Sequence, residues 1–190
     1  MKKFQKNQNM IAIYGDKMRK KNIVLIGFMG TGKSYIGEYI AKKLDMRFYD
    51  TDNIIEKDCK CKISYIFEKY GENYFRRVEN KVVSEISKKE KVVISTGGGI
   101  VLYKSNVEIL KKKGIIFLLD GSFNTIINNL YDDREKRPLL KGTDWKKKAM
   151  QLFLSRKELY YNSADYIINI DNKNKEDIAG EIINIYSFQK

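Results

Sequence analysis

Several residue types are scarce in this chain of 190 residues, and each scarcity excludes a kind of protein. Histidine is absent, and the two cysteines, Cys59 and Cys61, are one residue apart. A tetrahedral zinc site and an easily closed disulfide are therefore both excluded, and we expect two free thiols. A single proline, Pro138, argues against proline-rich linkers.

Long apolar runs are also missing. No stretch reaches the roughly 18 consecutive apolar residues that span a bilayer, and the polar residues 1–10 lack the apolar core of a secretory signal. We therefore expect a cytoplasmic protein without a membrane partner. The length and the hydrophobic fraction of 43% predict one globular domain, residues 22–190. Residues 1–21 show no clean periodicity and are interpreted as an N-terminal extension.

The formal net charge of +13 is high, and basic proteins commonly meet phosphates, nucleic acids or anionic membranes. Many of the basic residues stand in short runs, at 19–21, 111–113 and 146–148, where a solvated surface is the simpler interpretation. A general positive potential would still attract ATP and an acidic substrate. We expect no nucleic-acid partner and a monomer.

Short apolar runs alternate with helical patterns along the chain. The runs predict strands at 22–28, 47–49, 92–95, 114–120 and 166–170. Helical periodicity covers 33–44, most of 54–86, and 175–186. This alternation predicts an α/β fold with a parallel sheet, which binds its ligands at the carboxyl ends of the strands.

The segment Gly27 to Ser34 fits the phosphate-loop pattern G-x-x-x-x-G-K-[ST] at every fixed position. It lies between a predicted strand and a predicted helix, where its backbone N–H groups and the helix N-terminus can cradle a phosphate. Lys33 should reach the β- and γ-phosphates, and Ser34 should bind Mg²⁺. The loop predicts ATP binding but does not choose among motors, GTPases and kinases.

Asp50 and Asp52 follow the second predicted strand, where an extended backbone would direct both carboxylates to one face beside the phosphate loop. One carboxylate could then hold Mg²⁺ through water, and the other could take the proton of an acceptor hydroxyl. The alternative is that Asp52 only caps a helix beginning near Asn53.

Six segments in order, IGFMGTGKS, YDTD, EKYGENYFRRVE, STGGG, RPLL and SRKELY, resemble the shikimate kinase family over about residues 22–171. The resemblance implies a three-layer α/β/α P-loop kinase fold of the nucleoside-monophosphate-kinase-like type, with a mobile lid at about 131–144. It also implies transfer of the γ-phosphoryl group of MgATP to the 3-hydroxyl of shikimate, in the pathway to chorismate and the aromatic amino acids.

The resemblance assigns roles to individual residues. Lys33, Asp52 and Arg137 would be catalytic, Asp52 as the base and Arg137 as a lid arginine that stabilises the transferring phosphoryl group. Ser34 and Asp50 would serve Mg²⁺, with Ser95 as a weaker candidate. Shikimate would be bound by Asp52, Arg76, Gly98, Gly99 and Arg156, the two arginines holding its carboxylate. ATP would be bound by Gly30, Thr31, Gly32, Lys33, Ser34, Tyr35, Arg137 and Lys173.

One segment departs from the family pattern. Where an arginine usually covers the adenine, the sequence has Asn128-Asn129-Leu130. Either Arg134 reaches back to the base, or other groups hold it, such as those of the turn at 171–173.

Simpler interpretations compete with these roles. Arg76 or Arg77 could pair only with Glu72 or Glu79 on a helix face, and RPLL could be an ordinary surface loop. The rival functions are a kinase for another small hydroxy acid such as gluconate, a basic ATP-dependent nucleic-acid-binding module, and an inactive kinase retained for binding.

Overall fold

The computed structural model describes residues 22–131, 137–140 and 142–188. In chain order the elements are β1 (Asn22–Ile26), α2 (Lys33–Leu44), β2 (Arg47–Asp50), α3 (Thr51–Cys59), α4 (Ile63–Ile86), β3 (Val92–Ser95), η1 (Ile100–Leu102), α5 (Lys104–Lys111), β4 (Gly114–Asp120), α6 (Phe123–Leu130), η3 (Pro138–Leu140), α7 (Trp145–Ser163), β5 (Tyr166–Asn169) and α8 (Lys175–Phe188). The N-terminal extension and the lid residues 132–136 and 141 lie outside the described residues, and so does Arg134, which is one of them.

The five strands form one parallel sheet in the order β2-β3-β1-β4-β5. The predicted α/β class and parallel sheet are confirmed. The strand bounds differ slightly, because β1 ends at Ile26 and leaves residue 27 onward to the phosphate loop. Among the described helices, none combines the length and apolar character that a bilayer crossing requires.

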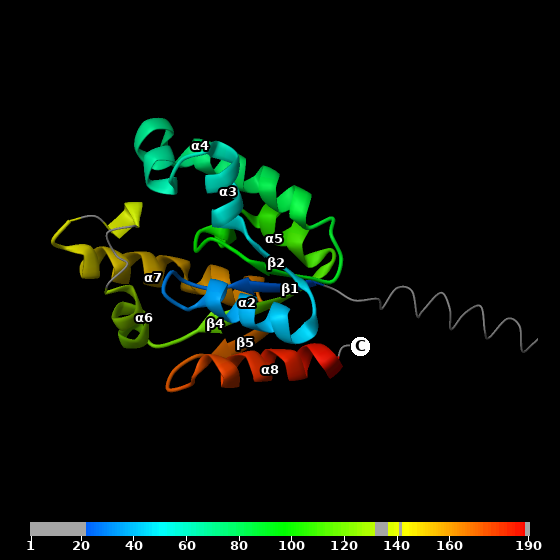
Figure 1. Ribbon diagram of the computed structural model, residues 1–190. Coiled ribbons are helices and arrows are strands. Elements are labelled where there is room, and N and C mark those ends of the chain that lie inside the picture. The colour runs from blue at the N-terminus through cyan, green and yellow to red at the C-terminus, as the bar shows by residue number, and fades with distance from the viewer. Residues whose placement is uncertain (1–21, 132–136, 141, 189–190) are drawn as a thin grey trace, which may run out of the picture.

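Side chains of the central strands alternate between two apolar clusters, one on each face of the sheet. Val24 and Ile26 of β1 face a cluster built with α3, α4, α5, α6 and α7. Ile23 and Leu25 face the cluster that α2 and α8 cover. Both faces are thus closed by helices (Figure 1), which is the reason the central strands β1, β3 and β4 are mostly apolar and buried.

Helix α4 is interrupted at Gly71, whose backbone is not helical (φ 77°, ψ 170°). This part of φ/ψ space is essentially open to glycine alone. The helix therefore consists of a short first part, 63–70, and a longer second part, 72–86. The second part carries Arg76 and Glu79.

Candidate active site

The phosphate loop connects β1 to α2 at the carboxyl edge of the sheet. Gly30 and Gly32 both adopt left-handed backbone conformations (φ 82° and 80°), which glycine accepts without steric cost. Gly32 is the N-cap of α2 and no side chain caps this helix end, so its first N–H groups are available to an anion.

Lys33 lies at the start of α2 and is 8% exposed. Its Nζ donates to the carbonyl oxygens of Gly27 and Phe28 at 2.9 and 2.8 Å. Burial, together with the nearby charge of Arg137, lowers the pKa of Lys33 to about 8. The ammonium group is therefore held inside the loop, where the oxygens of a nucleotide phosphate could replace these carbonyl oxygens as its hydrogen-bond acceptors.

Asp50 ends β2 and is the N-cap of α3, which corrects two expectations. Its Oδ1 accepts hydrogen bonds from the backbone N–H groups of Asp52 and Asn53 at 3.0 and 3.1 Å. The helix therefore begins at Thr51, so Asp52 lies in its first turn and neither continues an extended strand nor acts as the cap. The other oxygen of Asp50, Oδ2, accepts from the hydroxyl of Ser34 at 2.6 Å.

Asp52 carries a carboxylate with one buried oxygen that faces the site. Its Oδ1 is buried and has no hydrogen-bond partner among the described residues. Burial and the adjacent Asp50 raise the pKa of Asp52 to about 6, although Lys33, Arg137 and Arg76 oppose the rise. A carboxylate with this pKa is ionised at neutral pH and is a stronger base than an ordinary aspartate.

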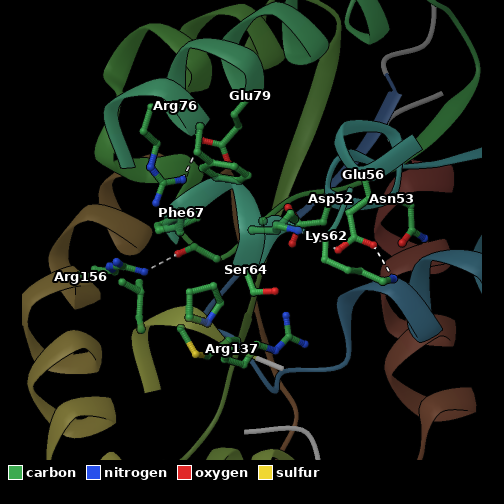
Figure 2. A pocket seen from close by; sticks show the side chains of 18 residues that line it. Asp52, Asn53, Glu56, Lys62, Ser64, Phe67, Arg76, Glu79, Arg137 and Arg156 are labelled. Atoms are coloured by element: carbon green, nitrogen blue, oxygen red, sulfur yellow. Dashed lines mark hydrogen bonds and ion pairs between the residues drawn. The ribbon is translucent and has the colours of Figure 1, made fainter. Parts of the chain in front are cut away.

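A cavity of about 650 Å³ opens beside Asp52. In the view of Figure 2, Arg76 and Arg156 lie on the left, and Asp52, Glu56 and Lys62 on the right. Apolar side chains make up much of the rest of the wall: Met29, Ile63, Phe67, Phe75, Pro138 and Leu139. The cavity therefore combines cationic groups and one free carboxylate with flat apolar walls, which suits a small hydroxylated anion.

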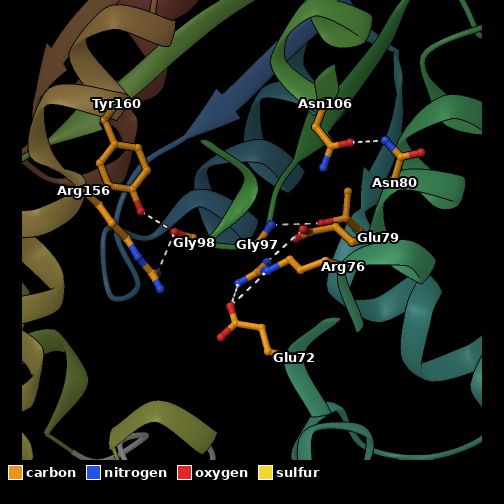
Figure 3. A network of polar contacts seen from close by, with 10 residues as sticks. Glu72, Arg76, Glu79, Asn80, Gly97, Gly98, Asn106, Arg156 and Tyr160 are labelled. Carbon is orange, nitrogen blue, oxygen red and sulfur yellow. Dashed lines mark hydrogen bonds and ion pairs between the residues drawn. The ribbon is translucent and has the colours of Figure 1, made fainter. Parts of the chain in front are cut away.

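Arg76 is buried and tied to two glutamates of its own helix (Figure 3). Its guanidinium group contacts Glu72 at 2.8 Å and Glu79 at 2.8 Å, so the pairing on the helix face is present. Glu79 is fully buried, and burial raises its pKa to about 7. The two carboxylates fix the guanidinium group at the cavity wall, and the pairing does not remove Arg76 from the site.

Arg156 is different, because no ion pair involves it among the described residues, although it is only 4% exposed. Its Nη1 donates to the carbonyl oxygen of Gly98 at 3.2 Å. The Tyr160 hydroxyl donates to the same oxygen, and burial raises the pKa of Tyr160 to about 12, which keeps this donor protonated. Arg156 is thus a buried cation that is held at Gly98 without a carboxylate partner among the described residues.

Arg137 also reaches the cavity. Its charge acts on both Lys33 and Asp52, and its Nε is buried with no hydrogen-bond partner among the described residues. The adjacent Pro138 and Leu139 line the same cavity. This part of the predicted lid therefore packs against the site, and RPLL is not an ordinary exposed loop.

The triple glycine after β3 passes close to three parts of the site. A side chain at Gly97 would meet Oδ1 of Asp52 at 2.6 Å, and one at Gly98 would meet the backbone nitrogen of Met29 at 3.2 Å. A side chain at Gly99 would meet the guanidinium group of Arg76. The close approach at Gly98 is thus to the phosphate loop, a reason for glycine that the sequence did not reveal.

Gly97→Ala should lower kcat by about tenfold to a hundredfold, because the added methyl group displaces Asp52. Gly97 does not have a left-handed φ, so the backbone itself admits alanine. Steady-state kinetics against Gly180→Ala make the test, since a side chain at Gly180 in α8 would meet nothing within 4 Å. An unchanged kcat in Gly97→Ala would show that the carboxylate tolerates a shift.

A second cavity, of about 410 Å³, lies on the α2 and α8 side of the phosphate loop. Thr31, Gly32, Tyr35 and Lys173 line it, together with polar side chains of α6 and the turn after β5: Thr125, Asn128, Asn129 and Asn172. Asn129 is already bonded to the carbonyl oxygen of Gly30 at 2.9 Å. Four of the residues that we expected at the nucleotide thus converge here.

Sequence reasoning missed several residues of the first cavity. Phe67 and Phe75 follow helical spacing and look like core residues, and nothing in the sequence separates a cavity wall from a core position. Glu56 and Lys62 look like ordinary surface charges, because their pairing depends on how two helices meet. The sequence indicates Glu79 only as a pairing partner of Arg76.

This chain combines a P-loop and a parallel sheet with a facing cavity that holds a carboxylate and buried arginines. This combination is typical of the P-loop kinases that act on small molecules. The model of the family described as shikimate kinase matches residues 29–187. This chain belongs to the shikimate kinase family.

Individual relatives agree with this assignment. The chain is 43% identical over 166 residues to the shikimate kinase of Caldanaerobacter subterraneus subsp. tengcongensis, covering 87% of this chain and 96% of that protein. The structure of shikimate kinase from Acinetobacter baumannii in complex with shikimate superposes with a TM-score of 0.86, at 34% identity, covering 91% of this chain and 96% of that one. A gluconokinase from Sinorhizobium meliloti 1021 shares only the fold, with a TM-score of 0.56 and 15% identity over 90% of this chain and 94% of that one.

Proposed function

We propose that this chain transfers the γ-phosphoryl group of ATP to the 3-hydroxyl of shikimate, giving 3-phosphoshikimate and ADP. The observation that carries the proposal is the convergence of Asp52, Arg76, Arg137 and Arg156 on one cavity beside the phosphate loop. Membership of the shikimate kinase family supports the same reaction.

Asp52 is the proposed base. As the oxygen of the acceptor hydroxyl forms its bond to the γ-phosphorus, the bond from that phosphorus to the β,γ-bridging oxygen breaks, and ADP leaves. The hydroxyl proton passes to the carboxylate of Asp52. The buried Oδ1 without a partner supports this role, because a base must have an oxygen free to accept the proton.

Lys33 and Arg137 are the proposed stabilisers of charge on the transferring group. Lys33 and the Nε of Arg137 are buried, and electrostatic interactions away from solvent are stronger than in water. Lys33 would exchange its loop carbonyls for phosphate oxygens when the nucleotide binds. Arg137 would enter from the lid, whose closure also excludes water that would hydrolyse ATP.

Ser34 and Asp50 fit a magnesium ion. Their oxygens are 2.6 Å apart, and the hydroxyl of Ser95 is 3.3 Å from that of Ser34. Mg²⁺ prefers oxygen ligands and keeps several waters, so a few oxygens beside bound phosphates suffice. We propose that Ser34 binds the ion and that Asp50 and Ser95 orient its water shell; when bound, the ion would neutralise charge on the β- and γ-phosphates.

The second cavity is the proposed site of the adenosine moiety. It adjoins the phosphate loop at Thr31 and Gly32, and Tyr35 and Lys173 form part of its wall. The amides of Asn128 and Asn172 offer a donor and an acceptor each to the edge of a base. In this proposal, amides take the place of the arginine that the family usually uses.

Arg156 is the proposed principal partner of the acceptor carboxylate, because Arg76 already holds two glutamates. Arg156→Ala should raise the KM for shikimate by about ten- to a hundredfold, which corresponds to the loss of a charged hydrogen bond. The KM for ATP should stay within about twofold. The exposed Lys157→Ala in the same helix is the matched control, and an unchanged KM for shikimate in Arg156→Ala would remove Arg156 from the site.

A coupled assay of ADP release tests the function as a whole. Shikimate should be phosphorylated, whereas gluconate and similar polyols should not. Absence of turnover with shikimate would overturn the proposal. Stimulation of ATP hydrolysis by DNA or RNA would instead favour the nucleic-acid-binding alternative, and its loss with rising salt would support that reading. The cytoplasmic location and the monomeric state of this protein remain predictions.

A further inference from the structure

The junction between α3 and α4 is organised by one residue, Glu56. Its backbone carbonyl oxygen accepts from the N–H of Cys61 at 3.2 Å, while Lys60 ends α3 in a left-handed conformation (φ 51°). Its side-chain Oε1 accepts from the N–H of Ile63, the first residue of α4, at 3.0 Å. The same residue therefore closes one helix and opens the next.

The carboxylate of Glu56 replaces a cap that the sequence does not supply locally. Lys62 occupies the N-cap position of α4, and its side chain makes no cap hydrogen bond because lysine has no acceptor. The Lys62 Nζ donates instead to Oε2 of Glu56 at 2.8 Å. Since the Lys62 side chain is 80% exposed, this ion pair should contribute little. The cap is the important interaction.

The helix that Glu56 caps is short and depends on its ends. The break at Gly71 leaves 63–70 as about two turns, and an isolated helix of that length is marginal in water. Ile63 and Phe67 of this segment form part of the wall of the first cavity. Ile66 anchors the segment in the core, and the cap fixes its start, so the position of Ile63 at the cavity wall depends on both.

Glu56 also connects two functional parts of the site. It lies one turn after Asp52 on α3, so both side chains project from the same face of that helix, and both line the first cavity (Figure 2). Between them, Ile55 is fully buried and fixes the helix in the core. The cap thus joins the helix that carries the proposed base to a second segment that lines the same cavity.

We infer that Glu56 is a positioning residue for the acceptor: its carboxylate caps α4 from the neighbouring helix and holds the wall at 63–67 in register with Asp52. Both of its oxygens are engaged, so it takes no part in proton transfer. The inference deepens the proposed function and rests on it.

Glu56→Ala tests the inference through the two Michaelis constants. The KM for shikimate should rise by roughly five- to tenfold, as expected for a lost N-cap, and the KM for ATP should stay within about twofold. Glu56→Gln keeps an acceptor oxygen and loses only the weak ion pair, so it should behave like the wild type. Glu108→Ala removes the carboxylate of an exposed ion pair in α5 and controls for a general effect of charge.

A second substitution separates the effect of the cap from a general loss of stability. Lys62→Ser supplies the side-chain oxygen that the N-cap position lacks, so α4 no longer needs Glu56. Lys62 itself lines the first cavity, so the KM for shikimate of Lys62→Ser alone is the reference for the double variant. The double variant Glu56→Ala with Lys62→Ser should return close to that value, and it gives a readable result even where Glu56→Ala alone does not fold.

The outcomes distinguish a failure of this inference from a failure of the proposed function. Wild-type protein that does not phosphorylate shikimate would overturn both. Wild-type turnover with an unchanged KM for shikimate in Glu56→Ala would overturn the inference alone. So would a parallel rise of both Michaelis constants, or a double variant that stays as impaired as Glu56→Ala, because each would reduce Glu56 to a general stabilising residue.

Discussion

Lys33→Ala should reduce kcat by about a hundred- to a thousandfold, the loss expected when a positioned donor is removed from a site that excludes water. The Lys33 side chain is almost fully buried, and the phosphate loop places its ammonium group among backbone carbonyls. The other two lysines of α2, Lys42 and Lys43, line neither cavity. Single-turnover measurement of ADP formation with saturating shikimate gives the clearest reading.

The substitution should also shift the titration of Asp52. The charge of Lys33 lowers the pKa of that carboxyl, so its removal should raise the pKa further above about 6. Lys42→Ala is the matched control, because Lys42 lies on the exposed face near the end of the same helix. Its kcat should equal that of the wild type. A Lys33→Ala protein with more than about a tenth of wild-type turnover would contradict the role.

The phosphate loop was the most predictable part of the site because its function and its local structure depend on the same residues. Glycines at 30 and 32 permit the left-handed turns, and the helix follows at once from Lys33 with the predicted bounds. Backbone geometry, capping and ligand binding are all local in sequence there. The parallel sheet was predictable for a similar reason, since its three central strands are isolated and mostly apolar runs.

The acceptor side was less predictable, because its side chains are placed by contacts between elements. Asp50 satisfies two N–H groups of α3 with one oxygen and Ser34 with the other, a division that the spacing of two aspartates does not reveal. An extended backbone was therefore the wrong expectation at Asp52. Glu56 shows the same limit, since it caps a helix seven residues further along the chain.

Charge offered a misleading signal as well. A net charge of +13 suggested polyanion binding as one alternative, yet the two buried arginines of the acceptor cavity form a very small part of that charge. The proposed role of these two arginines rests on their burial and not on the number of basic residues. Arg76 is held by two glutamates, and Arg156 has no carboxylate partner among the described residues. Burial of individual side chains is a property that composition does not contain.

Asp52→Asn should lower kcat by about a hundred- to ten-thousandfold, the range of a lost general base, with little change in the KM for ATP. In the wild type, kcat/KM for shikimate should fall as the pH drops through about 6, because only the ionised carboxylate accepts the proton. The asparagine variant should lack this acid limb. Asp58→Asn, the same change at an exposed position of α3, should leave both quantities unaltered.

Stability should change in the opposite direction from activity. The pKa of Asp52 in the folded protein, about 6, lies above its ordinary value of 3.8, so the folded state holds the proton more tightly than the unfolded state. Its ionisation therefore costs stability progressively as the pH rises from about 4 to about 6. At pH 7.5 the isosteric Asp52→Asn protein should consequently melt at a higher temperature than the wild type. A variant that lost both turnover and stability would show instead that Asp52 holds the fold together, and the assignment of the base would have to move elsewhere.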